Sequence, residues 1–145
     1  LPDCRLMVLG DGPEKDNLRQ QVSDLDIEDR VMFFSGDNTV ANFMEAADLV
    51  IIPTAAEGTP YTLLEALLHR KPVIANSSGN TSDYLPEEYL LESLEAEYIA
   101  GKIDDVFSHS ELTRDFDGLF TQAREEFTLD SMAKATWQVY SQLIA

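Results

Sequence analysis

The stretch LVIIPTAAEGTPYTLLEALL, residues 49–68, joins a short apolar run, a polar loop and a helical pattern. Its four leading apolar residues are typical of a strand that is buried on both faces. Thr59 and Pro60 fit the cap and the first position of a helix, where the missing N–H of proline costs nothing. Three leucines would form the buried side of that helix: Leu63, Leu64 and Leu67. The stretch therefore predicts a strand, a loop and a helix in succession.

The same alternation fills the first two thirds of the chain. Further apolar runs lie at 5–9, 31–34 and 72–75, with a weaker strand candidate at 89–91. Helical patterns lie between the runs, at 14–25, 40–47 and 60–68. Strands that alternate with helices at this spacing predict an α/β, Rossmann-like fold, a parallel sheet with helices on both faces.

From residue 94 onward the pattern is helical only. Three closing helices are expected, over 94–107, 111–127 and 129–144. Thr128 fits the N-cap of the last one. Trp137 and Tyr140 share a face of that helix, and we expect them to pack against the domain rather than bind a ligand.

Length and composition restrict the function. The 145 residues suit one domain, and the net charge of −17 argues against nucleic acid or anionic membrane surfaces as partners of this domain. One cysteine and two histidines offer no zinc-type cluster. No apolar run approaches the roughly 20 residues that span a bilayer, and we expect a cytoplasmic location.

Ligands of open α/β sheets bind outside the carboxyl ends of the strands, so the loops after the strands deserve inspection. The loop after the third strand leads with Glu57 into a helix that carries Glu65. The free N–H groups of a helix N-terminus suit a phosphate, and carboxylates accept hydrogen bonds from sugar hydroxyls. Two solvated surface glutamates are the alternative, and the residues leave the two interpretations about equally supported.

Five segments in order resemble a known family: residues 10–13 (GDGP), 31–36 (VMFFSG), 47–53 (ADLVIIP), 57–66 (EGTPYTLLEA) and 71–75 (KPVIA). Together they are similar to the C-terminal half of retaining GT-B glycosyltransferases of family 4, the glycosyl transferases group 1. The resemblance covers nearly the whole chain, including the closing helix.

The resemblance implies a domain that binds a nucleotide-sugar (NDP-sugar) donor without a metal or other cofactor, which agrees with the absence of a zinc-type cluster. Glu57 and Glu65 match the two ends of the family's E-x(7)-E motif, which implies that Glu57 is the catalytic carboxylate beside the donor sugar and that Glu65 holds the ribose. The other donor-binding residues implied by the match lie around the helix start and in the first two loops: Gly58, Thr59, Tyr61, Thr62, Leu63, Gly10, Gly12, Gly36 and Asp37.

The sequence departs from the family at several positions. Pro60 and Arg70 stand where glycine is common, and Arg70 implies either a left-handed residue or a different helix end. In the family's strand order, 3-2-1-4-5-6, the central first strand carries an arginine and is followed by a lysine, and no segment here matches it. We therefore expect residues 1–145 to be a fragment that lacks this strand-helix unit and is inactive alone. The expected partners of this domain are the NDP-sugar donor and the N-terminal acceptor domain of the same enzyme, which the fragment is also expected to lack.

Two further interpretations stay open. A non-catalytic α/β interaction or signalling module would keep the fold without sugar transfer. The D-x-D sequence at 115–117 matches a metal motif of the other major glycosyltransferase fold, but its helical surroundings favour a solvated helix face.

Overall fold

The computed structural model describes residues 4–36, 40–54, 61–108 and 112–144. The chain divides into two compact units, Leu1–Ala46 and Ala47–Ala145, each of which is described by itself.

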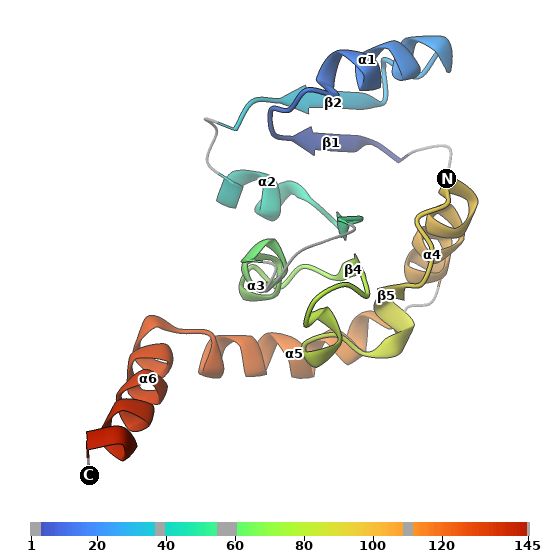
Figure 1. Ribbon diagram of the computed structural model, residues 1–145. Helices are drawn as coiled ribbons and strands as arrows, with labels where there is room; N and C mark the ends of the chain where they lie inside the picture. Colours follow the sequence, from blue (N-terminus) through green and yellow to red (C-terminus); the bar gives the residue numbers. More distant parts are fainter. Residues whose placement is uncertain (1–3, 37–39, 55–60, 109–111, 145) are drawn as a thin grey trace. The chain divides into compact units, whose positions relative to one another are not determined.

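The first unit is a parallel strand pair with two helices. It contains β1 (Leu6–Leu9), α1 (Lys15–Asp24), β2 (Val31–Phe34) and α2 (Val40–Ala46) (Figure 1). β1 and β2 pair in parallel from Leu6 opposite Val31 to Leu9 opposite Phe34. Leu6 and Met32 are 48% and 38% exposed, so the expected burial of both strand faces is wrong for this unit. The strands themselves lie where the apolar runs predict them.

The second unit holds a three-stranded parallel sheet in the order β3-β4-β5. Its elements are β3 (Val50–Ile52), α3 (Tyr61–Leu68), β4 (Val73–Asn76), the short 3₁₀ turns η1 (Thr81–Asp83) and η2 (Glu87–Tyr89), β5 (Leu90–Leu91), α4 (Ala96–Ser108), α5 (Leu112–Glu126) and α6 (Leu129–Ile144). The parallel pairing and the three closing helices agree with the sequence pattern, and the α/β, Rossmann-like fold is confirmed.

The core of the second unit is centred on β4. Val73, Ile74 and Ala75 are at most 1% exposed, as expected for a strand covered on both faces. Ile74 packs in one cluster with Leu91 of β5 and Val106 of α4. Since successive side chains alternate across a strand, Val73 and Ala75 face the other side, and α3 contacts both β3 and β4.

The buried side of α3 differs from the predicted one by one residue. Leu63 and Leu67 are buried as predicted, but Ala66 takes the third position and Leu64 is only half-buried. α3 also packs against α5, so its buried side is set by two neighbours rather than by the sheet alone.

Arg70 ends α3 in the left-handed conformation, with φ +58°, one of the two outcomes expected from the missing glycine. The amide of Arg70 donates to the Leu67 carbonyl at 3.0 Å, and the amide of Lys71 donates to the Ala66 carbonyl at 2.9 Å. This bond pattern is the Schellman motif, with arginine where glycine is usual. The Arg70 guanidinium lies 2.9 Å from a carboxylate oxygen of Asp117 and 5.2 Å from the ring centroid of Phe120, both on α5.

The D-x-D sequence lies within α5, as expected. Phe116 is fully buried against the rings of Tyr89 and Phe120, at centroid distances of 4.3 and 5.7 Å. Asp117 is occupied by Arg70. Phe116 and Asp117 thus have structural roles in this helix.

α6 begins as the sequence predicts and then differs from expectation. The Thr128 hydroxyl accepts a hydrogen bond from the Ser131 amide at 3.1 Å, which confirms the N-cap. Trp137 and Tyr140 are 68% and 58% exposed, so the prediction that they pack against the domain is wrong for the described part of the unit. None of the described helices is long and apolar enough to span a membrane.

Candidate functional site

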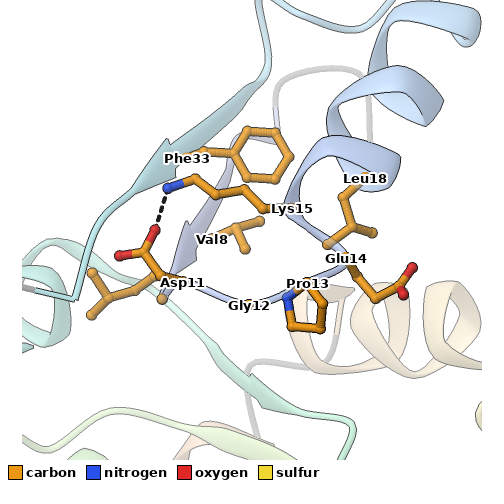
Figure 2. Close-up of a pocket in the computed structure, with 10 residues that line it drawn as sticks. Val8, Asp11, Gly12, Pro13, Glu14, Lys15, Leu18 and Phe33 are labelled. Atoms are coloured by element: carbon orange, nitrogen blue, oxygen red, sulfur yellow. Dashed lines mark hydrogen bonds and ion pairs between the residues drawn. The ribbon is translucent and has the colours of Figure 1, made fainter.

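Asp11 joins the two loops at the carboxyl ends of β1 and β2. One carboxylate oxygen accepts a hydrogen bond from the Gly36 amide at 3.1 Å, and the other pairs with Lys15 Nζ (Figure 2). The Gly10 amide also donates to the Phe34 carbonyl at 3.1 Å. The structure thus brings together the loops of Gly10, Gly12 and Gly36, three of the predicted site residues.

The carboxylate of Asp11 is held in its ionised form. The hydrogen bond from Lys15 lowers the pKa of Asp11 from its ordinary value, and the Gly36 N–H lowers it further. Sequence reasoning did not assign a role to Asp11 or Lys15. Their four-residue spacing at the start of α1 was the one available signal.

A shallow pocket of about 250 Å³ adjoins this pair. Figure 2 shows Val8, Leu18 and Phe33 contributing apolar side chains to it, with Lys15 reaching to Asp11. The full lining consists of residues of β1, of the turn after it and of α1, together with one residue of β2: Val8, Leu9, Gly10, Asp11, Gly12, Pro13, Glu14, Lys15, Leu18 and Phe33. The pocket therefore combines apolar walls with the Lys15–Asp11 ion pair at the carboxyl ends of β1 and β2.

The three glycines of these loops differ in what they require. Gly10 has φ +140°, a conformation that side chains rarely adopt. A Cβ atom built at Gly12 or Gly36 would meet no atom within 4 Å. Crowding by the described part of the chain therefore does not explain glycine at these two positions.

In the second unit, α3 presents the described part of the E-x(7)-E segment. Tyr61 is 78% exposed, and Thr62 and Glu65 are exposed as well. Leu63, a predicted donor-binding residue, is 0% exposed, so neither its side chain nor its backbone presents a surface to a ligand. Tyr61 and Glu65 share the exposed side of the helix because they are four residues apart. The predicted site residues Glu57, Gly58, Thr59 and Asp37, and the helix cap assigned to Thr59 and Pro60, lie outside the described residues.

The loops after β3 and β4 are tied together at the Thr54 carbonyl. Asn76 Nδ2 donates to this oxygen at 3.0 Å, and Ser78 Oγ donates to it at 3.1 Å. Asn76 is the last residue of β4, and Ser78 lies in the segment after it. Their partner is a backbone atom 22 or 24 residues away, so the sequence gives no signal for the pairing.

Within the described ranges, no three or more histidine, cysteine, aspartate or glutamate side chains gather where they could hold a metal ion. The polar groups that the described loops at the carboxyl ends of the strands offer include carboxylates, hydroxyls, backbone amides and the Lys15 ammonium.

Comparison with known proteins identifies the family. The family model described as "Glycosyl transferases group 1" matches residues 1–118. An uncharacterized glycosyltransferase of Haemophilus influenzae is 30% identical over 77% of this chain and 33% of its own length. The N-acetyl-alpha-D-glucosaminyl L-malate synthase of Bacillus anthracis is 29% identical over 86% of this chain and 35% of its own length. The chain thus spans about a third of the length of these curated relatives.

Solved structures agree on the fold. Crystal structures of Anabaena Alr3699/HepE, one in complex with UDP and one with UDP-glucose, superpose with a TM-score of 0.87 at 24% identity. The match covers 98% of this chain and 42% of the Anabaena chain. The chain belongs to the glycosyl transferases group 1 and forms a glycosyltransferase domain of the GT-B fold.

Proposed function

We propose that this chain is the donor-binding domain of a retaining glycosyltransferase of family 4, which moves a sugar from an NDP-sugar to a glycan, lipid or other acceptor. The observation that carries the proposal is the family match over residues 1–118, which includes both glutamates of the E-x(7)-E segment. UDP and UDP-glucose in the Anabaena structures support a uridine nucleotide as the first donor to test.

Glu65 is the proposed ribose clamp. Its carboxylate lies on the exposed side of α3, while Leu63, Ala66 and Leu67 fix the helix in the core. A carboxylate held on a rigid element can accept hydrogen bonds from two adjacent hydroxyls, and such charge-assisted bonds are stronger than neutral ones. In this assignment Glu57 lies beside the donor sugar, near the carbon that reacts.

The amino-terminal turn of α3 is the proposed diphosphate site. Tyr61 and Thr62 are the first described residues of the helix and are exposed, and N–H groups in the first turn of a helix have no partner within the helix. These groups and the helix dipole favour the negative charge that develops on the departing diphosphate. No metal or cofactor is part of the proposal, and the nucleotide-sugar is a substrate.

The remaining parts of the enzyme are proposed to lie outside these residues. The chain covers 33% and 35% of the two curated relatives, which supports a longer protein with an acceptor-binding domain. Cations that neutralise the diphosphate would come from the strand-helix unit that precedes the second strand of the family order. We further propose that this protein acts in the cytoplasm, with the full-length enzyme peripheral at the membrane.

Donor-dependent turnover of the full-length protein tests the proposal. UDP-, GDP- and ADP-sugars are supplied separately, and release of the nucleotide diphosphate is measured with Glu57→Ala, Glu65→Ala and the control Glu125→Ala. Glu125 is an exposed glutamate on the last turn of α5. We expect one donor class to be used and both site variants to lose most activity. Wild-type turnover in both would refute the site, and no turnover or binding with any donor would favour a non-catalytic module.

A further inference from the structure

The backbone ladder between β3 and β4 ends where the candidate site begins. The strands pair from Val50 opposite Val73 to Ile52 opposite Ala75. The Val50 amide donates to the Pro72 carbonyl, so residues 50, 52 and 54 direct their backbone groups toward β4, and Pro53 faces the other side. Thr54 is therefore the next residue after Ile52 whose backbone faces β4.

Two side chains take over the connection. Asn76 and Ser78 both donate to the carbonyl oxygen of Thr54, at 3.0 and 3.1 Å. A carbonyl oxygen has two lone pairs, so both bonds can form at once. The end of the β3 segment is therefore held by two side-chain hydrogen bonds beyond the last paired residues of the two strands.

The donors lie at the end of the buried strand β4 and shortly after it. Asn76 is the last residue of β4 and is paired with Leu91 of β5, and the Ser77 amide donates to the Leu91 carbonyl at 3.4 Å. The three residues before Asn76 are at most 1% exposed. The position of the Thr54 carbonyl is thus fixed by residues in and next to β4, the central strand of the sheet.

We infer that Asn76 and Ser78 are positioning residues for the catalytic loop of this domain. Glu57 follows Thr54 by three residues, and the loop rejoins the described structure at Tyr61 of α3. At the Tyr61 end, the fully buried Leu63 anchors α3 in the core. At the Thr54 end, the two hydrogen bonds to the Thr54 carbonyl hold the chain. The inference rests on the proposed function, because it assigns the anchoring to the loop that carries the sugar-side carboxylate.

The consequence differs from that of losing a donor contact. Asn76 and Ser78 would act on the reacting carbon through the placement of Glu57, whereas Glu65 on α3 would still hold the nucleotide. Misplacement of a group by about 1 Å can cost about 100-fold in rate. Loss of the two bonds should therefore reduce kcat much more than it weakens binding of UDP.

The test uses the full-length protein with Asn76→Asp, Ser78→Ala and the double variant. Aspartate keeps the size of asparagine but cannot donate, and alanine removes the hydroxyl. Ser78→Thr restores a hydroxyl, and Ser77→Ala alters the exposed serine between the two donors. Hydrogen exchange of residues 50–54, kcat and KM for the sugar donor, the Kd of UDP and Tm are measured for each.

In the double variant we expect faster exchange at the end of β3 and a fall in kcat of about tenfold to 100-fold. The Kd of UDP should change by less than about threefold, because a misplaced loop leaves Glu65 in position. Ser78→Thr and Ser77→Ala should behave as wild type. If Asn76→Asp lowers Tm, the role of the bonds is judged from Ser78→Ala alone, compared with wild type and with Ser78→Thr, which restores the hydroxyl.

Three results would overturn the inference. Unchanged exchange at residues 50–54 would mean that the two bonds do not hold Thr54, whatever the activity. Faster exchange with wild-type kcat would mean that the bonds do not position the catalytic loop. A wild-type protein that neither binds nor turns over any sugar donor would refute the proposed function, and the positioning role would fall with it while the exchange data still report on the bonds.

Discussion

Replacing Arg70 tests how the chain ends α3 without the usual glycine. Arg70→Ala keeps a Cβ in the left-handed conformation but removes the contacts with Asp117 and Phe120. The ion pair is about half exposed, at 55% and 67% for the two side chains, so it contributes at most about 1 kcal/mol. The guanidinium over the Phe120 ring contributes about 0.5–1 kcal/mol at an exposed site. Arg70→Ala should therefore destabilise the protein by about 0.5–2 kcal/mol.

Arg70→Gly loses the same contacts but relieves the left-handed conformation. A residue with a side chain is destabilised by about 1–2 kcal/mol in the left-handed conformation, and glycine avoids this cost. Glycine also loses more conformational entropy on folding, which offsets part of the gain. We expect Arg70→Gly to be more stable than Arg70→Ala by about 1 kcal/mol and to lie within about 1 kcal/mol of wild type. Urea unfolding followed by circular dichroism gives the two differences, and Asp117→Asn reports the ion pair alone. An alanine variant at least as stable as the glycine variant would refute the explanation.

Further predictions concern the first two loops and the core. Gly10→Ala should destabilise by about 1–2 kcal/mol because φ is +140°, whereas Gly12→Ala should leave Tm unchanged because its Cβ meets no atom within 4 Å; equal losses in thermal melts would contradict this. Asp11 has a lowered pKa, so its stabilising effect is present above the ordinary value near 3.8 and is lost as the pH falls through the folded pKa. Asp11→Asn should therefore lower Tm at pH 7 and have a smaller effect at strongly acidic pH, and a pH-independent difference would count against it. Leu63→Ala removes a side chain with 0% exposure and should cost about 2–5 kcal/mol in urea unfolding, while a loss below about 1 kcal/mol would show that α3 is not held by this core.

The sequence predicts the elements well because each has a local cause. The continuous apolar run at 72–75 corresponds to β4, the most buried strand, and Thr128 caps α6 through a bond to a residue only three positions away. The shared exposed side of Tyr61 and Glu65 on α3 likewise follows from their four-residue spacing. Such features depend on short-range pattern and are visible without any tertiary information.

The errors and omissions depend on tertiary contacts. Ala66 replaces Leu64 in the core because α3 packs on α5 as well as on the sheet, which the helical period does not specify. Apolar character alone indicated burial for Trp137, which is 68% exposed. The bond from Gly36 to Asp11 joins residues 25 positions apart and leaves no periodic trace in the sequence. The loop ties at the candidate site were therefore accessible only from the structure.

Calorimetric titration of UDP into the full-length protein tests the central claim most directly. Wild type, Glu65→Ala and the exposed control Glu125→Ala are compared at one pH and salt concentration. Loss of charge-assisted bonds to the ribose should weaken UDP binding at least about tenfold in Glu65→Ala, with Glu125→Ala unchanged. Equal affinity of wild type and Glu65→Ala for UDP would contradict the assignment of α3 as the nucleotide-binding helix.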